Sequence, residues 1–474
     1  MIAKPAFSLL WILACCLLGG CANTLVARAE TTAASRIASI ADERAVASAL
    51  TVADAHGEVR PADRVASLRR LGDEGREALL QRQLAAMVAF GDVRLYEGTD
   101  SRLLVDGPET FAAMFDAIAR ARRTILLESY IIDDAEVARS LARLLLTKRA
   151  EGVQVAVIYD DIGSITTPDG YFEEMRRGGV MVCAFNPVSP LRRPGYWDIT
   201  HRDHRKILVV DDRIAFTGGI NISGVYASGS SQFGRGRDYH REAGWRDTQL
   251  QLRGPAVEPL AILVRQTWLE QGCEGGVPGF DPGQPSGGGT AGDDVAWVIA
   301  SSPDDERNRI YAMLLAAIDA SVASIHLTMA YFAPGEDMVA ALEDAARRGV
   351  EVQLILPSQS DFRPVLYAGR SYYQRLLDAG VDIHEFGNAV LHAKTAVIDG
   401  VISTVGSSNM DWRSFGGNNE VNVVVLGRDF ARRMQAMFQD DLAASRRITP
   451  EAWAGRALHE RLLEGLARVL EPLW

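Results

Sequence analysis

Two copies of one pattern of potentially catalytic residues, H-x-K-x-x-x-x-D, occur in the chain, at 204–211 and at 392–399. In both copies an Asn follows the Asp by ten residues, at Asn221 and Asn409. One copy could arise by chance, whereas two copies with a further matched position form a strong signal. The residues that define the two copies are His204, Lys206 and Asp211, and His392, Lys394 and Asp399.

Paired imidazole, ammonium and amide groups suit the exchange of a phosphodiester. This reaction needs a nucleophile, an acid for the leaving group and donors for the phosphoryl oxygens. One neutral His can attack phosphorus and form a phosphohistidine, while a second, protonated His donates to the leaving oxygen. Lys206 and Lys394 would supply cationic donors, and Asn221 and Asn409 neutral ones. We therefore expect a site without a metal ion or cofactor, although the residues alone do not tell the two His apart.

Each copy of the pattern is predicted to lie on a β-hairpin. The apolar runs 207–210 and 395–398 indicate buried strands, and the Asp that follows each run begins a turn. Residues two apart in a strand face the same way, so the His and Lys of each copy project together. Asp211 and Asp399, at the turns, are interpreted as holding the geometry of the pattern rather than contacting substrate.

The hairpins belong to a longer internal repeat, because Tyr130, 152–158 and 179–182 match Tyr331, 349–355 and 380–383 in the same order. Strands and helices alternate, which favours a mixed or parallel sheet covered on both faces. We predict an α/β fold of two repeated halves packed with pseudo-twofold symmetry. In the first half, strands are predicted over 93–97, 125–131, 153–159 and 180–185, and helices over 109–121, 137–149 and 171–177. The predicted segments are a leader (1–20), a tether with a helix over 76–90 (21–90), the first half (91–272), a Gly- and Pro-rich linker (273–294), the second half (295–445) and a helical C-terminal segment (446–474).

The N-terminus has the features of an export signal. Lys4 precedes an apolar run that is too short to span a bilayer, and Leu18-Gly-Gly precedes Cys21. Cys21 in this context resembles the lipidation site of bacterial lipoproteins, and an ordinary signal peptide that contains a Cys is the alternative. We expect an exported lipoprotein on the periplasmic face, tethered by acyl chains. Ala22 after the Cys favours the outer membrane, by resemblance to lipoprotein sorting.

The charge and the cysteines restrict the function further. The net charge of −11 disfavours a nucleic acid partner. Cys183 and Cys273 are the two cysteines that follow the N-terminal region. A disulfide between them is compatible with an oxidising compartment, but we interpret them as one buried thiol and one unrelated thiol.

The two patterns resemble the paired HKD motifs of the phospholipase D superfamily, and their context is similar to bacterial cardiolipin synthases. The resemblance covers about 93–445 and implies a phospholipase D-like fold for both halves. It implies that His204 is the nucleophile and His392 the acid and base. Glu420 resembles the family's Glu partner of a catalytic His, and Asp247 occupies the matching place in the first half. One departure is the export signal, which stands where these synthases usually have two transmembrane helices. The stretches that carry the resemblance, beyond the two motifs, are 216–221, 245–248, 331–334, 370–373, 406–414 and 418–420.

The resemblance implies a phosphatidyltransferase of cardiolipin synthase type, which passes a phosphatidyl group through a phosphohistidine to an alcohol such as phosphatidylglycerol. A phospholipase D that passes the same group to water is the alternative, because only the acceptor differs. An exported nuclease is a third hypothesis, which the acidic charge and the predicted anchor disfavour. We expect phospholipid substrates and a monomer.

Overall fold

The computed structural model describes residues 43–71, 77–88, 91, 93–189, 200–230, 244–279, 288–305 and 308–471. The predicted leader, Cys21 and the start of the predicted tether lie outside these residues. Within the described ranges, no helix combines the length and apolar character that crossing a membrane requires.

The first half is a seven-stranded mixed sheet with the order β6-β5-β4-β8-β9-β10-β3 among its described residues. The strands β4, β5 and β6 run parallel and the others pair antiparallel. The predicted strand–helix alternation is therefore present, but β3 extends to Val105, well beyond the predicted end at 97. The bounds are β3 (Arg94–Val105), β4 (Thr124–Ser129), β5 (Gln154–Asp160), β6 (Met181–Phe185), β8 (Lys206–Val210), β9 (Ile214–Gly218) and β10 (Thr248–Arg253).

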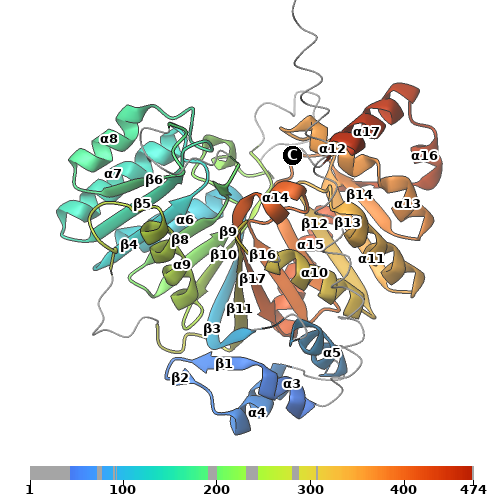
Figure 1. Cartoon of the computed structure of the whole chain (residues 1–474), viewed down its shortest axis with the longest axis horizontal. Coiled ribbons are helices and arrows are strands. Elements are labelled where there is room, and N and C mark those ends of the chain that lie inside the picture. The colour runs from blue at the N-terminus through green and yellow to red at the C-terminus, as the bar shows by residue number, and fades with distance from the viewer. Residues whose placement is uncertain are drawn as a thin grey trace, which may run out of the picture.

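The second half repeats this sheet with the order β14-β13-β12-β15-β16-β17-β11. β3 pairs with both β10 and β11, so the sheets of the two halves are continuous. Figure 1 shows the halves side by side, joined at these central strands. The predicted fold of two repeated halves is confirmed. The bounds are β11 (Asp294–Ser301), β12 (Ser324–Met329), β13 (Glu351–Pro357), β14 (Asp382–Phe386), β15 (Lys394–Ile398), β16 (Ile402–Gly406) and β17 (Asn418–Leu426).

Helices cover both faces of each sheet, because every central strand has apolar side chains on its two sides. The core of the first half packs β4 and β5 against α6, α7 and α8, and the core of the second packs β12 and β13 against α10, α11 and α13. A third core, between the halves, contains α9 and α15. The bounds are α6 (Asp106–Ala119), α7 (Glu136–Ala150), α8 (Asp169–Arg177), α9 (Val257–Glu270), α10 (Arg309–Ala320), α11 (Gly335–Arg347), α13 (Tyr373–Asp378) and α15 (Arg428–Ala443).

The prediction of a tether up to the helix at 76–90 is wrong for residues 43–71. These residues fold as α3 (Glu43–Ala49), β1 (Thr51–Asp54), β2 (Gly57–Glu58) and α4 (Pro61–Leu71), followed by α5 (Glu77–Val88) in the place of the predicted helix. The strand β1 pairs with the start of β3, and Leu50 and Leu68 are buried in the core of the second half. The apolar residues of this segment are scattered among polar ones and have no clear helical or strand period. They are buried because β1 pairs with the start of β3.

The C-terminal segment is only partly helical. The strand β18 (Ser445–Ile448) pairs antiparallel with β14, which extends the second sheet beyond its repeat. Two helices follow, α16 (Pro450–Ala454) and α17 (Leu458–Leu470). The helix α17 packs on α12 (Arg363–Arg370), at the upper right of Figure 1, and α14 (Trp412–Gly416) lies nearer the middle of the molecule.

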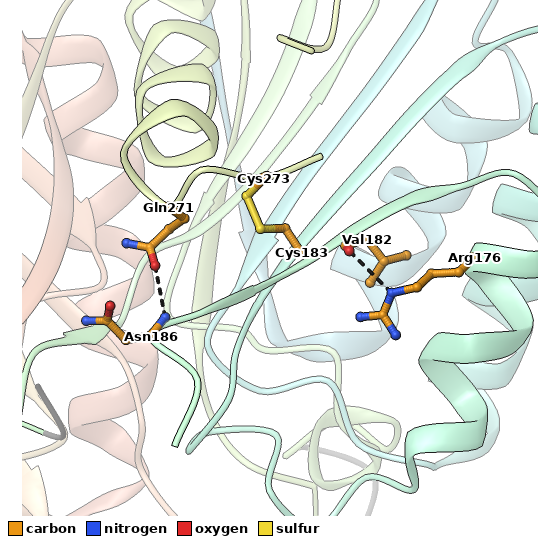
Figure 2. Close-up of a disulfide and its surroundings, with 6 residues drawn as sticks. All are labelled: Arg176, Val182, Cys183, Asn186, Gln271 and Cys273. Carbon is orange, nitrogen blue, oxygen red and sulfur yellow. Dashed lines mark hydrogen bonds between the residues drawn. A yellow bond between two sulfur atoms is a disulfide. The ribbon is translucent and has the colours of Figure 1, made fainter. Parts of the chain in front are cut away.

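Cys183 and Cys273 form a disulfide, which corrects the interpretation of two unrelated thiols. Figure 2 shows the bond between β6 and the turn after α9, close to a hydrogen bond from Asn186 N to Gln271 Oε1 of 3.0 Å. The cysteines are 90 residues apart, with Cα atoms separated by 5.7 Å. Pairing depends on how α9 packs over the sheet, which the spacing of two cysteines does not specify.

Candidate active site

The two hairpins have the predicted form, with His204 just before β8 and His392 just before β15. Asp211 and Asp399 lie at the turns, with φ of 55° and 53°. The Asp211 carboxylate accepts hydrogen bonds from the backbone N–H groups of Arg122, Arg123 and Thr124, at 2.9, 2.7 and 2.9 Å. These bonds fasten the turn to the start of β4. The Asp211 side chain therefore holds the first hairpin in place.

Asp399 makes the equivalent bonds in the second half. Its carboxylate accepts from the backbone N–H groups of Val322, Ala323 and Ser324, at 3.1, 2.7 and 3.2 Å, which fastens the turn to the start of β12. The side chain of Gln83, on α5, also donates to it at 3.0 Å.

Each motif His contacts a carboxylate from the opposite half. His204 Nδ1 lies 2.9 and 3.0 Å from the Glu420 oxygens, and His392 Nδ1 lies 2.7 Å from Asp247 Oδ2. An ionised carboxylate only accepts hydrogen bonds, so Nδ1 carries the proton and Nε2 is left for chemistry. Glu420 and Asp247, the predicted orienting residues, thus lie beside the two His, and each contacts the His of the other half.

Backbone pairing produces this exchange. The strand β7 (Arg202–Asp203) pairs in parallel with Asn418 and Asn419 at the start of β17, so Glu420 follows beside His204. His204 N donates to Asn419 O at 3.0 Å. Across the pseudo-twofold axis, a parallel bridge joins Arg246 to Leu391, and His392 N donates to Arg246 O at 2.7 Å. The residue after each of these backbone acceptors is the carboxylate partner.

The two Lys lie buried beside the two His. Lys206 Nζ donates to the His204 carbonyl oxygen at 2.6 Å. Lys394 Nζ lies 2.9 Å from His392 Nδ1 and also donates to the His392 carbonyl oxygen. The electrostatic influence of each Lys reaches the His of the other half, so the four groups form one charged cluster.

The two Asn are not equivalent in the structure. Asn221 is engaged on both sides, because its Oδ1 accepts from Ile131 N at 3.1 Å and its Nδ2 donates to the Tyr226 hydroxyl at 3.4 Å. Asn409 Oδ1 is buried and has no hydrogen-bond partner within the described part of the chain. Asn409 is therefore the more available of the two amides for a ligand.

Aromatic rings surround both His. Tyr130 meets His204 edge-on at 5.0 Å between centroids, with Lys206 Nζ 5.2 Å from the same ring. Tyr331 lies 6.2 Å from His392 in the same arrangement, as the repeat predicts. No role was assigned from the sequence to three further residues, although Trp245 and Ser407 lie in stretches that carry the family resemblance. They are Tyr226, whose hydroxyl lies 3.1 Å from His392 Nδ1; Trp245, whose ring lies 5.3 Å from His392; and Ser407, whose hydroxyl donates to Glu420. None of the three has a matched residue in the other motif that could have drawn attention to it.

Burial controls the electrostatics of the cluster. Burial lowers the pKa of both His, and Lys394 lowers that of His392 further, so both imidazoles are neutral at pH 7 in the absence of substrate. Burial also lowers the pKa of Lys206 to about 7 and that of Lys394 to about 8.

The two carboxylates respond differently to the same burial. Burial raises the pKa of Asp247 to about 6, with Lys394 opposing the shift. Burial also acts to raise the pKa of Glu420, but interaction with His204 and Lys206 outweighs it and lowers the value to about 2. Glu420, which contacts His204, therefore stays ionised to a lower pH than Asp247, which contacts His392.

This arrangement can carry out nucleophilic substitution at phosphorus. It offers two neutral imidazoles with carboxylate-bound Nδ1 atoms, two ammonium groups that can bind a phosphodiester anion, and the Asn409 amide, whose Oδ1 has no partner among the described residues. No three His, Cys, Asp or Glu side chains in the described ranges are grouped to hold a metal ion.

Several known proteins have similar sequences. A family model described as "Cardiolipin synthase, PLD-like domain" matches residues 114–228 and 314–442, one stretch in each half. The chain is 37% identical over 386 residues to cardiolipin synthase 2 of Bacillus anthracis, covering 81% of this chain and 72% of that protein. It is 34% identical over 403 residues to cardiolipin synthase A of Pseudomonas aeruginosa, covering 84% of this chain and 79% of that protein.

Among solved structures, the phosphatidylserine synthase of Haemophilus influenzae matches with a TM-score of 0.57 and 12% sequence identity, covering 79% of this chain and 95% of that one. At this identity the match supports the fold alone.

Proposed function

This chain belongs to the cardiolipin synthase family of phospholipase D-like proteins, and from that premise we propose that it is a phosphatidyltransferase that makes cardiolipin from phosphatidylglycerol. The observation that carries the proposal is the pair of motif His, each fixed by a carboxylate and each flanked by a buried Lys.

In the first step, neutral His204 attacks phosphorus of one phosphatidylglycerol through Nε2. His392, which becomes protonated when the lipid anion raises its pKa, donates a proton to the departing glycerol oxygen. Glu420 balances the positive charge that develops on His204. Lys206 and Lys394 stabilise the phosphoryl oxygens, and Asn409 offers a neutral contact. The product is a phosphatidyl group bound to His204.

In the second step, the headgroup hydroxyl of another phosphatidylglycerol enters. His392, now neutral, takes its proton, the alkoxide attacks phosphorus, and the bond to His204 breaks. This releases cardiolipin and restores both His. Water in place of the lipid alcohol would give phosphatidic acid, so synthase and hydrolase differ only in which acceptor reaches the phosphohistidine.

Incubation of the purified protein with labelled phosphatidylglycerol in detergent tests the proposal. We expect labelled cardiolipin, with one glycerol released for each. Phosphatidic acid as the main product would make the protein a phospholipase D, and loss of either product in His204→Ala would assign the activity to this site. A product that does not depend on His204 would contradict the proposal.

We also propose that the protein is exported and anchored by acyl chains on Cys21, with the enzyme on the periplasmic face of the outer membrane. The support is the run of residues before Cys21 and the Ala after it. Metabolic labelling with a clickable palmitate should mark the wild-type protein but not Cys21→Ser. Equal labelling of both proteins would contradict the anchor.

A further inference from the structure

The terminal helix α17 buries Glu464 and leaves most of its large apolar residues exposed, the reverse of an ordinary surface helix. Glu464 is 3% exposed and forms an ion pair with Arg456. Glu471, just after the helix, accepts from the Tyr372 hydroxyl at 2.9 and 2.8 Å. Arg468 pairs with Glu336 on α11. The inner face is therefore held by ion pairs and hydrogen bonds as well as by the apolar packing of Ala467.

The outer face of α17 carries a row of apolar side chains, and His459 and Arg461 are also exposed on this helix. Leu458, Leu462, Leu466 and Val469 follow one another at intervals of four, four and three residues, so they share one side of the helix. With Leu463 they are exposed by 40% to 76%. A contiguous row of this kind is uncommon on a soluble surface and marks a binding face.

The helix is connected to the active site through one small apolar cluster. Ala467 of α17 packs with Val365 and Ala368 of α12, and the Tyr331 ring packs on the same cluster. Tyr331 lies beside His392 and donates a hydrogen bond of 2.7 Å to Asp361. The inner face of α17 is thus linked to the catalytic cluster through α12 and the Tyr331 ring.

Two more apolar side chains are exposed next to this connection. Phe362 follows Asp361 at the start of α12, and Trp412 begins α14, three residues after Asn409. Figure 1 shows α12 and α17 together at the upper right, with α14 nearer the middle of the molecule. Exposed apolar residues therefore occur both on the terminal helix and beside the residues that would bind the phosphate.

We propose that the outer face of α17, with Phe362 and Trp412, docks onto the surface of a phospholipid bilayer and so turns the active site toward its lipid substrate. The inference rests on the proposed function, because a lipid substrate must be taken from a bilayer. A helix with Leu on one face that lies in the plane of the interface is a known mode of membrane binding.

Charge and size favour a bilayer over a protein partner. Glu464 is buried on the inner face of α17, away from the proposed contact, while Arg461 is exposed beside it, which suits an anionic lipid surface. A helix of 13 residues is about 20 Å long, which gives too little area for a stable protein interface on its own.

Photolabelling tests the contact independently of activity. The full chain would be mixed with vesicles of phosphatidylglycerol and phosphatidylethanolamine that contain a phosphatidylcholine with a diazirine in its acyl chain. After irradiation, mass spectrometry should find the label on peptides that cover 458–470, and not on those that cover 257–270, where Ile262 and Leu269 are exposed on α9. Equal labelling of the two helices, or crosslinks from α17 to a second copy of the chain in place of lipid, would overturn the proposal.

A matched pair of variants tests the consequence for catalysis. Leu462→Gln/Leu466→Gln should reduce transfer on vesicles by at least about ten-fold, because two buried Leu contacts with lipid are lost. Transfer on monomeric dihexanoyl phosphatidylglycerol should change less than about two-fold, since no bilayer is involved. Ile262→Gln/Leu269→Gln on α9 should leave both rates unchanged. An equal loss on both substrates, or no loss on vesicles, would overturn the proposal. If the wild type transfers neither lipid, the proposed function fails while the photolabelling still decides the docking.

Discussion

At the scale of single residues, the two catalytic His differ although their motifs repeat. His204 faces Glu420, whose pKa is lowered to about 2, whereas His392 faces Asp247, whose pKa is raised to about 6. Lys394 Nζ and the Tyr226 hydroxyl also lie close to Nδ1 of His392. Glu420 stays ionised over a wide pH range, which favours attack by Nε2 of His204. Asp247 has a higher pKa, so the His392–Asp247 pair suits a group that must gain and lose a proton. The motifs alone could not distinguish these roles.

Single substitutions should separate the two roles. With a p-nitrophenyl phosphodiester, which has a good leaving group, His392→Ala should release a burst of nitrophenol near one equivalent and accumulate an acid-labile phosphoenzyme, because the base for the second step is missing. His204→Ala should give no burst. Peptide mass spectrometry of the trapped enzyme would locate the phosphate. A burst in His204→Ala with phosphate on His392 would reverse the roles, and the absence of phosphoenzyme in both variants would remove the support for a covalent intermediate.

The buried Lys should make activity fall as pH rises. Their pKa values of about 7 and about 8 mean that Lys206 and then Lys394 lose their positive charge in the free enzyme through this range, and with it affinity for the phosphodiester anion. We expect kcat/KM for a soluble phosphodiester to decline above pH of about 7. Lys206→Arg, which stays charged, should move the decline toward the pKa of Lys394. A flat profile up to pH of about 9, in a protein that circular dichroism shows to be folded, would contradict this assignment.

At the scale of elements, the sequence predicted the hairpins and the strand–helix alternation because each depends on local period and turn residues. It did not predict the second part of β3, because Asp100 to Arg102 are polar and their pairing with β10 is long-range. It missed the folding of residues 43–71 and the strand β18 for the same reason, since each is stabilised by an edge that another part of the chain provides. The disulfide is a further long-range feature, joining β6 to the end of α9.

Removing the disulfide should destabilise the first half without altering the chemistry. The bond closes a loop between residues 90 apart, and Cys183→Ala/Cys273→Ala should lower the free energy of unfolding by about 2–4 kcal/mol. Dithiothreitol should lower the stability of the wild type to that of the variant and leave the variant unchanged, as measured by urea denaturation. Equal stability of the oxidised wild type and the variant would show that the bond contributes nothing measurable.

At the scale of the whole molecule, the active site exists only because the two halves pack together. The repeat correctly places a His, a Lys and a carboxylate in each half, yet Glu420 serves His204 and Asp247 serves His392. Arg246 reinforces the join, since its guanidinium forms two hydrogen bonds of 2.8 and 2.7 Å with Asp441 of the second half. Which half supplies each carboxylate follows from the packing of two sheets, and an internal repeat contains no information on that packing.

The exchange of partners predicts which step each carboxylate controls. Glu420→Gln should act on His204 and slow formation of the phosphoenzyme from the p-nitrophenyl substrate by on the order of 100-fold or more, as the loss of an orienting carboxylate does in other His-dependent sites. Asp247→Asn should act on His392, so the nitrophenol burst remains and transfer to the alcohol stalls. Rapid-quench kinetics would measure both steps. If each carboxylate served the His of its own half, the two phenotypes would be interchanged. Combined with His204→Ala, Glu420→Gln should lower the rate of phosphoenzyme formation little further, because Glu420 acts through His204. Combined with His392→Ala, Glu420→Gln should lower this rate by its full factor.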